Sequence, residues 1–137
     1  MSRCIFCAIA AGDAPSERVT EDERTMAFLD IHPAGEGHTL VIPKVHADNV
    51  FDASPEDWAA VWETSRRVAL ALREAFAPDG LYVREANGRL GGQEVMHLHV
   101  HLIPRYAAGR APSVGALGAV AERLRAEVQG PPVGRPS

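Results

Sequence analysis

The chain has 137 residues, of which 46% are hydrophobic, so we expect one domain with a sizeable core. Its formal net charge of −4 argues against broad electrostatic binding to a nucleic-acid polymer, which usually needs a basic face. The sequence contains no run of about 18 apolar residues and does not open with a basic-then-apolar leader, so we expect a cytoplasmic protein without a membrane partner.

The first third of the chain predicts a short helix and three strands. The helix spans residues 4–11 and is ended by Gly12, a residue type common just past helix C-termini. The third strand stops at Pro43, because proline cannot donate a hydrogen bond to a sheet ladder. The three predicted strands span residues 17–21, 25–29 and 38–42.

A long helix is predicted in the middle of the chain. Ser54 suits the N-cap and Pro55 suits the first helical position, and acidic residues follow in the first turn. The helix runs to about Ala77, ahead of a Pro-Asp-Gly turn. Apolar residues at three- and four-residue spacing define its buried face. These residues are Trp58, Val61, Trp62, Val68, Ala69, Leu72 and Phe76.

The second half of the chain predicts two more strands and a weak helix. The strands span Leu81–Ala86 and Met96–Ile103, and the helix spans Val114–Val128. Residues 130–137 are rich in glycine and proline and are predicted to be a disordered tail, so the domain covers residues 1–129. Strands in sequence around one long helix indicate an α+β fold with helices packed on a sheet face.

Residues 97–102 read His-Leu-His-Val-His-Leu, the alternation of a half-buried strand. Successive side chains of a strand point to opposite faces, so the three histidines share one face and the aliphatic residues share the other. A row of imidazoles suits proton transfer, nucleophilic attack or metal binding at neutral pH.

This segment resembles the signature of the histidine triad (HIT) family of nucleotide-binding hydrolases and transferases. Further segments match the family's glycine-rich approach, its ribose- and phosphate-contacting segments, and the start of its zinc-containing, Hint-like bacterial members. They are Asn87-Gly88 and Gly91–Val95, then Phe28–Ile31 and Gly37–Lys44, and finally Cys4–Cys7. The resemblance covers about residue 4 to Tyr106. It implies a five-stranded antiparallel sheet with a long helix and short flanking helices, which dimerises into a ten-stranded sheet.

The catalytic assignments concern three histidines. A neutral imidazole can attack phosphorus and form a phosphoramidate, and His99 is the predicted nucleophile. His101 would face the same phosphate, where an imidazolium could stabilise the charge on the non-bridging oxygens. The resemblance implies that His38 also contacts the α-phosphate.

The nucleotide-binding assignments begin with Asp30, whose carboxylate can accept hydrogen bonds from a ribose diol. The alternative is a turn residue before His32-Pro33. Apolar residues around it could close a slot for a purine, although ordinary core packing explains them equally well. These apolar residues are Ile5, Phe6, Ile9, Phe28 and Ile31.

The glycine-rich loop supplies the remaining phosphate contacts. Gly92, with Gly91 before it, lets the backbone approach a phosphate closely. Asn87 and Gln93 can donate neutral hydrogen bonds to the phosphate or the leaving group. Glu94 stands where the family often has serine or threonine, so we expect its backbone N–H to serve and its side chain to turn away.

Cys4, Cys7, His46 and His97 are the predicted ligands of a structural Zn²⁺. The two cysteines have zinc-compatible spacing, and the two histidines complete a tetrahedral set that leaves no open position for catalysis. The alternative is two free thiols and an unrelated surface His46.

The leading functional hypothesis is a nucleotidyl hydrolase or transferase that cleaves at the α-phosphate of a purine nucleotide of the AMP or GMP type. The alternative is a nucleotide-binding partner protein with incidental turnover. A third hypothesis, in which the three alternating histidines hold one catalytic metal, fits poorly because same-face strand neighbours lie about 6.5–7 Å apart. The sequence does not identify the leaving group.

Overall fold

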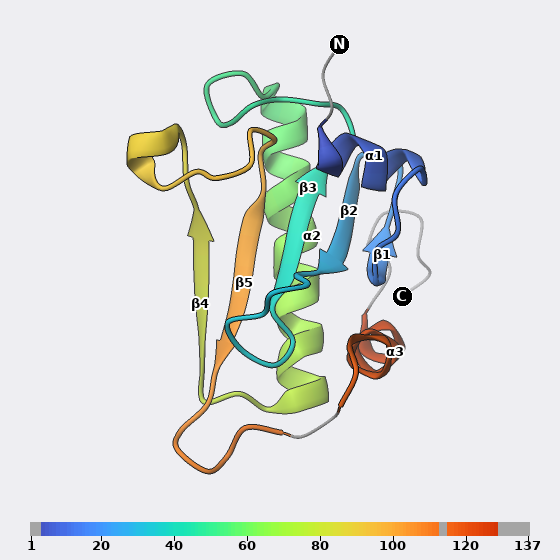
Figure 1. Ribbon diagram of the computed structural model, residues 1–137, viewed down its shortest axis with the longest axis vertical. Coiled ribbons are helices and arrows are strands. Elements are labelled where there is room, and N and C mark those ends of the chain that lie inside the picture. Colours follow the sequence, from blue (N-terminus) through green and yellow to red (C-terminus); the bar gives the residue numbers. More distant parts are fainter. Residues whose placement is uncertain (1–3, 113–114, 129–137) are drawn as a thin grey trace.

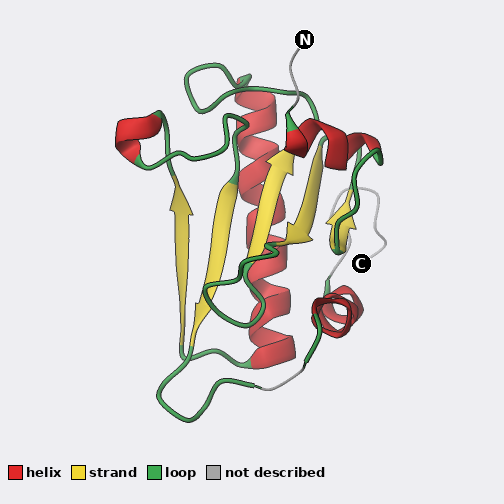
Figure 2. Ribbon diagram, viewed as in Figure 1, coloured by secondary structure: helices red, strands yellow, loops and turns green. Residues whose placement is uncertain are grey.

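The computed structural model describes residues 4–112 and 115–128. Within these residues one antiparallel sheet has the strand order β1-β2-β3-β5-β4 (Figures 1 and 2). The elements are α1 (Ile5–Ala11), β1 (Arg18–Glu21), β2 (Thr25–Leu29), β3 (Thr39–Pro43), α2 (Pro55–Phe76), β4 (Gly80–Glu85), the 3-10 turn η1 (Arg89–Gly91), β5 (Val100–Arg105) and α3 (Leu117–Glu127). The predicted five-stranded α+β architecture is confirmed. The start of the predicted last helix at Val114, the boundary at residue 129 and the tail at 130–137 lie outside the described residues.

The long helix α2 begins and ends as its sequence predicts. The Ser54 hydroxyl accepts a hydrogen bond from the Asp57 N–H at 3.0 Å, and Pro55 occupies the first turn. After Phe76, Ala77 adopts a left-handed conformation with φ of 46° and ends the helix. None of the helices in the described residues is long and apolar enough to cross a membrane.

The sheet buries apolar side chains on both faces. Successive side chains of its strands point alternately into two hydrophobic clusters. Figure 1 shows α2 running behind the sheet, where it buries the larger cluster with α3, including Val41, Val100 and Leu102. The smaller cluster lies on the opposite face under α1, where Phe6 and Phe28 contact each other edge to face. This second face carries the histidines.

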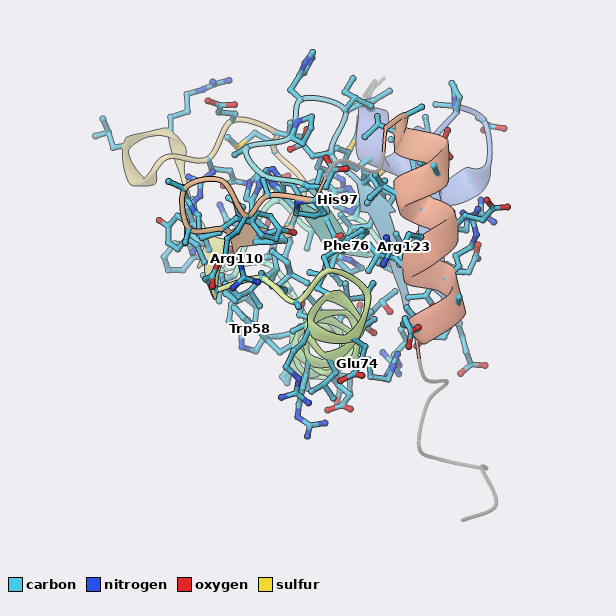
Figure 3. The ribbon with its side chains drawn as sticks, turned by 90° about the horizontal axis from the view of Figure 1, so that it is seen from below. Trp58, Glu74, Phe76, His97, Arg110 and Arg123 are labelled. Atoms are coloured by element: carbon cyan, nitrogen blue, oxygen red, sulfur yellow. The ribbon has the colours of Figure 1, made fainter. Side chains whose placement is uncertain are left out.

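The helix α3 closes the side of the core next to β1. Its buried residues pack against the cluster under α2, and Val120 and Leu124 are almost fully enclosed. The guanidinium of Arg123 lies 5.1 Å from the centre of the Phe76 ring and also donates to the Ala75 carbonyl (Figure 3). These contacts attach the end of the described chain to α2.

The strand predicted at Met96–Ile103 is displaced in the structure, because β5 starts only at Val100. The N–H of Leu98 donates to the Ala47 carbonyl at 2.8 Å instead of to the neighbouring strand. The Pro43 carbonyl, at the end of β3, lies 2.9 Å from a ring nitrogen of His97. Residues 97–99 therefore precede the strand, although their side chains keep the predicted alternation between the two faces.

Candidate active site and metal site

A cavity of about 400 Å³ opens on the α1 face of the sheet, bounded by α1, β2 and the loop before β5. One side is apolar and the other is formed by histidines and charged residues. Two of the three predicted catalytic histidines, His99 and His101, line it. The predicted nucleotide-binding residues that also line it are Ile5, Phe6, Phe28, Asp30, Ile31, Gly92 and Glu94. The structure thus brings together residues from four separate segments of the chain.

His99 is held in one tautomer by the backbone. Its Nδ1 lies 2.7 Å from the carbonyl oxygen of His97, so Nδ1 carries the proton and donates it. The other ring nitrogen, Nε2, therefore presents a lone pair. Burial lowers the pKa of His99, and the edge of the ring lies against Phe6 with the ring centres 5.2 Å apart. A neutral, oriented imidazole is the form that a nucleophile requires.

His38 and His101 form a hydrogen-bonded pair beside His99. The N–H of Ala34 donates to Nδ1 of His38 at 3.0 Å, so a neutral His38 carries its proton on Nε2. That Nε2 lies 3.0 Å from Nδ1 of His101, which accepts the hydrogen bond. The same Nε2 lies 3.5 Å from Oδ2 of Asp30.

The protonation state of His101 differs from the prediction. Burial, together with the neighbouring His99 and the guanidinium of Arg84, lowers its pKa to about 4. At neutral pH His101 is therefore a neutral imidazole that lines the cavity, and not the expected imidazolium. A fixed positive charge is present instead on Arg84, which the sequence reasoning missed and which lines the cavity beside His101.

Asp30 forms the turn that the sequence offered as one alternative, and its position also leaves it open to a ligand. Its Oδ1 accepts a hydrogen bond from the His32 N–H at 2.9 Å, which stabilises the turn after β2. Its carboxylate also lines the cavity with about a fifth of the side chain exposed. Each carboxylate oxygen can accept more than one hydrogen bond, so the turn leaves acceptor capacity for a ligand.

Two predicted phosphate donors are engaged elsewhere. Both amide hydrogens of Gln93 are used, because Nε2 donates to the carbonyls of Asp48 and Val95. The Asn87 side chain accepts from the Val50 N–H and donates to a carboxylate of β4. Neither side chain lines the cavity, so these amides organise the loops around it. Gly92 lines the cavity with φ of 101°, a conformation that favours glycine.

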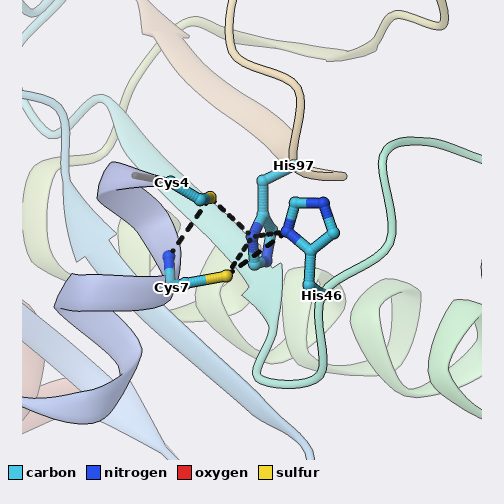
Figure 4. Close-up of side chains that lie close together, drawn as sticks. All are labelled: Cys4, Cys7, His46 and His97. Carbon is cyan, nitrogen blue, oxygen red and sulfur yellow. Dashed lines mark hydrogen bonds between the residues drawn. The ribbon is translucent and has the colours of Figure 1, made fainter. Parts of the chain in front are cut away.

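Four side chains from three separate segments converge beside the start of α1, namely Cys4, Cys7, His46 and His97 (Figure 4). Their ligand atoms all lie within 4.8 Å of one another. Each sulfur lies 3.3 Å from the nearer Nδ1, and the two Nδ1 atoms are 3.2 Å apart. A tetrahedral zinc ion would separate sulfur from nitrogen by about 3.6 Å and nitrogen from nitrogen by about 3.3 Å. The four residues therefore form a candidate metal site.

Hydrogen bonds behind the two rings fix which nitrogen faces this site. Nε2 of His97 donates to the Pro43 carbonyl at 2.9 Å, and Nε2 of His46 donates to the Asp48 carboxylate at 2.8 Å. Both Nδ1 atoms therefore direct lone pairs toward the sulfurs and toward each other. Burial lowers the pKa of His97 to about 4, so its ring is neutral. Lone pairs that face each other repel unless a cation lies between them. A metal ion bound at this position would be that cation.

His97 belongs to the candidate metal site with His46 and the two cysteines, apart from His101. His101 belongs instead to a group with Asp30 and His38. The three alternating histidines therefore do not converge on one ion, which argues against the third hypothesis. His46 is likewise not an isolated surface residue, since its ring contacts that of His97 edge to face.

Comparison with known proteins places the chain in a family. The HIT domain matches residues 11–108, well over half of the sequence. The chain belongs to the HIT family. The Bacillus subtilis relative named Protein hit is 48% identical to this HIT protein over 106 residues, which are 77% of this chain and 73% of the relative. Adenosine 5'-monophosphoramidase hnt1 of Schizosaccharomyces pombe is 40% identical over 102 residues, which are 74% of each chain.

Solved structures of HIT proteins share the fold. A Zn-bound histidine triad family protein from Mycobacterium smegmatis superimposes with a TM-score of 0.83 at 38% identity. The match covers 91% of this HIT protein and 92% of the other chain. The sheet order and helix placement described above are therefore those of the HIT fold.

Proposed function

We propose that this HIT protein is a hydrolase or transferase that cleaves purine nucleotide conjugates, adenosine conjugates above all, at the α-phosphate. The observation that carries this proposal is the hydrogen bond from Nδ1 of His99 to the His97 carbonyl. It leaves Nε2 of a neutral imidazole with a free lone pair in a residue that lines a nucleotide-sized cavity. The Schizosaccharomyces pombe relative, by its name an adenosine 5'-monophosphoramidase, supports the same reaction class.

The reaction proceeds in two displacements. In the first, Nε2 of His99 forms a bond to the α-phosphorus, the bond to the leaving group breaks, and its electron pair goes to the leaving atom. The ring is then positively charged, and its Nδ1–H bond to the His97 carbonyl becomes charge-assisted. In the second, water forms a bond to phosphorus, the P–N pair returns to Nε2, and the proton from water passes to solvent. A transferase would use another acceptor in place of water.

The apolar side of the cavity would hold the purine and the carboxylate of Asp30 would hold the ribose. Phe6 and Phe28 meet edge to face with ring centres 5.4 Å apart, and Ile5 and Ile31 are half-exposed or more at the rim. An apolar slot with one acceptor for a diol suits a nucleoside, since the base needs apolar contact and the ribose needs hydrogen bonds.

We further propose that the metal at Cys4, Cys7, His46 and His97 is Zn²⁺. The Zn-bound Mycobacterium smegmatis neighbour and the facing lone pairs support this assignment. All four ligands come from the protein, so the ion is structural and supplies no chemistry to the reaction. Its role is to hold His97, whose carbonyl orients the nucleophile.

We also propose a homodimer formed through β4. This strand is an edge of the sheet, and its Tyr82 and Val83 side chains are 46% and 41% exposed. An open edge strand pairs readily with another strand, so two copies of β4 would give one continuous ten-stranded sheet.

The deciding experiment traps the intermediate. Wild-type protein is mixed with adenosine phosphoramidate, adenylyl sulfate, a dinucleoside polyphosphate or an acyl adenylate, quenched in alkali and analysed by peptide mass spectrometry. We expect an AMP adduct on His99. His99→Ala should form none and lose at least about 1,000-fold in kcat while still binding AMP, because the attacking atom is gone and the other contacts remain.

His101→Ala provides the matched comparison. It should slow turnover yet still give the adduct on His99, because only a neighbouring group is removed. An adduct on another residue, or full activity in His99→Ala, would overturn the assignment of the nucleophile. AMP binding without an adduct or turnover of any conjugate would favour the nucleotide-binding partner protein instead.

A further inference from the structure

Arg84 is placed beside the reacting groups by the sheet itself. It lies on β4 directly opposite His101 of β5, and paired residues of antiparallel strands project from the same face. Its Nη2 lies 3.3 Å from Nε2 of His101, and its Nη1 lies 3.6 Å from where a Cβ on Gly92 would be. The guanidinium therefore lies between the histidine pair and the glycine of the loop.

This guanidinium has no acidic partner among the described residues. The salt bridges formed by residues 4–112 and 115–128 do not include Arg84, although two carboxylates, those of Asp30 and Glu94, line the same cavity. Arginine keeps its charge at any physiological pH. Arg84 is thus a permanent cation, and the remaining positively charged side chains of the described chain lie outside the cavity lining.

The hydrogen bonds around His101 determine which of its ring nitrogens carries the proton that faces Arg84. Ala34 fixes the proton of His38 on Nε2, and that proton is donated to Nδ1 of His101. A neutral His101 then carries its own proton on Nε2, the atom that faces Arg84. With this tautomer both Nη2 of Arg84 and Nε2 of His101 are donors, and they lie 3.3 Å apart. An anion that accepts from both donors would satisfy this arrangement.

We propose that Arg84 and Nε2–H of His101 bind an anionic leaving group beside His99, which makes phosphoanhydride conjugates of the nucleotide the preferred substrates. This inference rests on the proposed function and names its substrate class. When Nε2 of His99 attacks the α-phosphorus, the bond to the bridging oxygen breaks and its electron pair stays on the leaving phosphate. Arg84 neutralises the charge that develops there, and the phosphate leaves without having to gain a proton.

The alternative class of leaving group is an amine, for which Arg84 offers no benefit. An amine leaving from a phosphoramidate has to gain a proton, and a guanidinium does not release one at neutral pH. A protonated amine would also be repelled by the adjacent cation. The position of Arg84 therefore favours a phosphate or polyphosphate over an amine.

The test compares two substrates that share the same adenylyl group. Diadenosine triphosphate has an anionic leaving group and adenosine 5'-phosphoramidate has an amine. We expect Arg84→Gln to lower kcat/KM for diadenosine triphosphate by about 100-fold, the usual effect of removing one donor that stabilises developing charge. The same variant should change kcat/KM for the phosphoramidate by less than about fivefold. Arg84→Lys should recover part of the loss, because it restores the charge without the two-pronged geometry.

Arg89→Gln is the matched control. Arg89 is an exposed arginine of η1, close to β4 in the chain, and it does not line the cavity. This variant removes the same charge and should stay within twofold of wild type on both substrates. Equal losses on the two substrates in Arg84→Gln, or losses matched by Arg89→Gln, would overturn the proposal.

A binding measurement tests anion binding by Arg84 separately from catalysis by His99. Calorimetric titration with pyrophosphate should show binding about tenfold weaker in Arg84→Gln than in wild type or Arg89→Gln, with a smaller dependence on salt. Unchanged pyrophosphate binding would overturn the role of Arg84 even if turnover proceeds through His99. Conversely, a wild-type protein that binds pyrophosphate through Arg84 but turns over neither substrate would contradict the proposed reaction and leave the anion site established.

Discussion

At the scale of single residues, backbone atoms decide how the histidines act. The carbonyl of His97 fixes the proton of His99, the N–H of Ala34 fixes that of His38, and the carbonyl of Pro43 fixes that of His97. A ring nitrogen that donates in one direction presents a lone pair in the other. One residue type thus presents a free lone pair at His99, a donated proton at His38 and a lone pair toward the two cysteines at His97, according to the backbone group behind it.

The role of Asp30 can be tested by varying the ribose. Asp30→Ala should weaken AMP binding about 10- to 100-fold and leave 2',3'-dideoxy-AMP little changed, since a hydrogen bond to a charged group contributes about 1.5–3 kcal/mol. Asp30→Asn keeps an oxygen that can accept from the His32 N–H, so it controls for loss of the turn. Calorimetry with both ligands provides the measurement. Similar losses for the two ligands would remove Asp30 from the ribose site.

At the scale of elements, the candidate metal site lies between α1 and the segment that precedes β5. Cys4 and Cys7 come from the start of α1, and His97 comes from the irregular segment at 97–99. This segment lacks ladder hydrogen bonds to β3, because its Leu98 N–H is donated to a loop carbonyl. The Pro43 carbonyl and the proposed metal site would therefore provide the positioning that strand pairing does not.

Removal of the metal should lower the stability of the folded protein. Purified protein should contain about one zinc per chain by elemental analysis, and a chelator should lower the melting temperature because the ion binds the folded arrangement best. Cys4→Ser should behave like chelation and should reduce activity only through misplacement of His99. His32→Asn serves as a control histidine variant outside the cluster and should keep its zinc. Metal-free protein of unchanged stability would contradict the zinc site.

At the scale of the whole molecule, the sheet has two different edges. The β1 edge contacts α3, whereas β4 presents Tyr82 and Val83 to solvent. Two copies of β4 related by a twofold axis would contribute the same surface patch to the interface. The sheet therefore has one edge suited to extension across a dimer.

The dimer can be tested by charging that edge. Wild-type protein should sediment as a dimer in analytical ultracentrifugation, and Val83→Glu should shift it toward monomer, because each copy would bring a negative charge into the paired strands, where like charges repel. Glu63→Gln, an exposed substitution on α2, offers a control of similar size that should not change the sedimentation. A wild-type monomer at micromolar concentration, or a dimer unaffected by Val83→Glu, would argue against pairing through β4.

Local sequence determined most of the elements and the identity of the reactive groups. The Ser54-Pro55 helix start, the Gly12 helix end and the alternation at residues 97–102 each depend on neighbouring residues, so short-range patterns were enough to predict them. Residue chemistry and spacing, together with the resemblance to the HIT family, predicted the zinc ligands and the nucleophile, and the structure brings those residues into two compact groups.

Only the tertiary structure decided the protonation and the partners of those groups. His101 is neutral because the fold buries it beside Arg84, and the Gln93 amide is used up by carbonyls of another loop. The register of β4 against β5 places Arg84 opposite His101, which lies 17 positions further along the sequence. Burial, register and loop contacts depend on segments distant in the sequence. Residue order therefore fixes which chemical groups are present, and packing fixes what each of them can do.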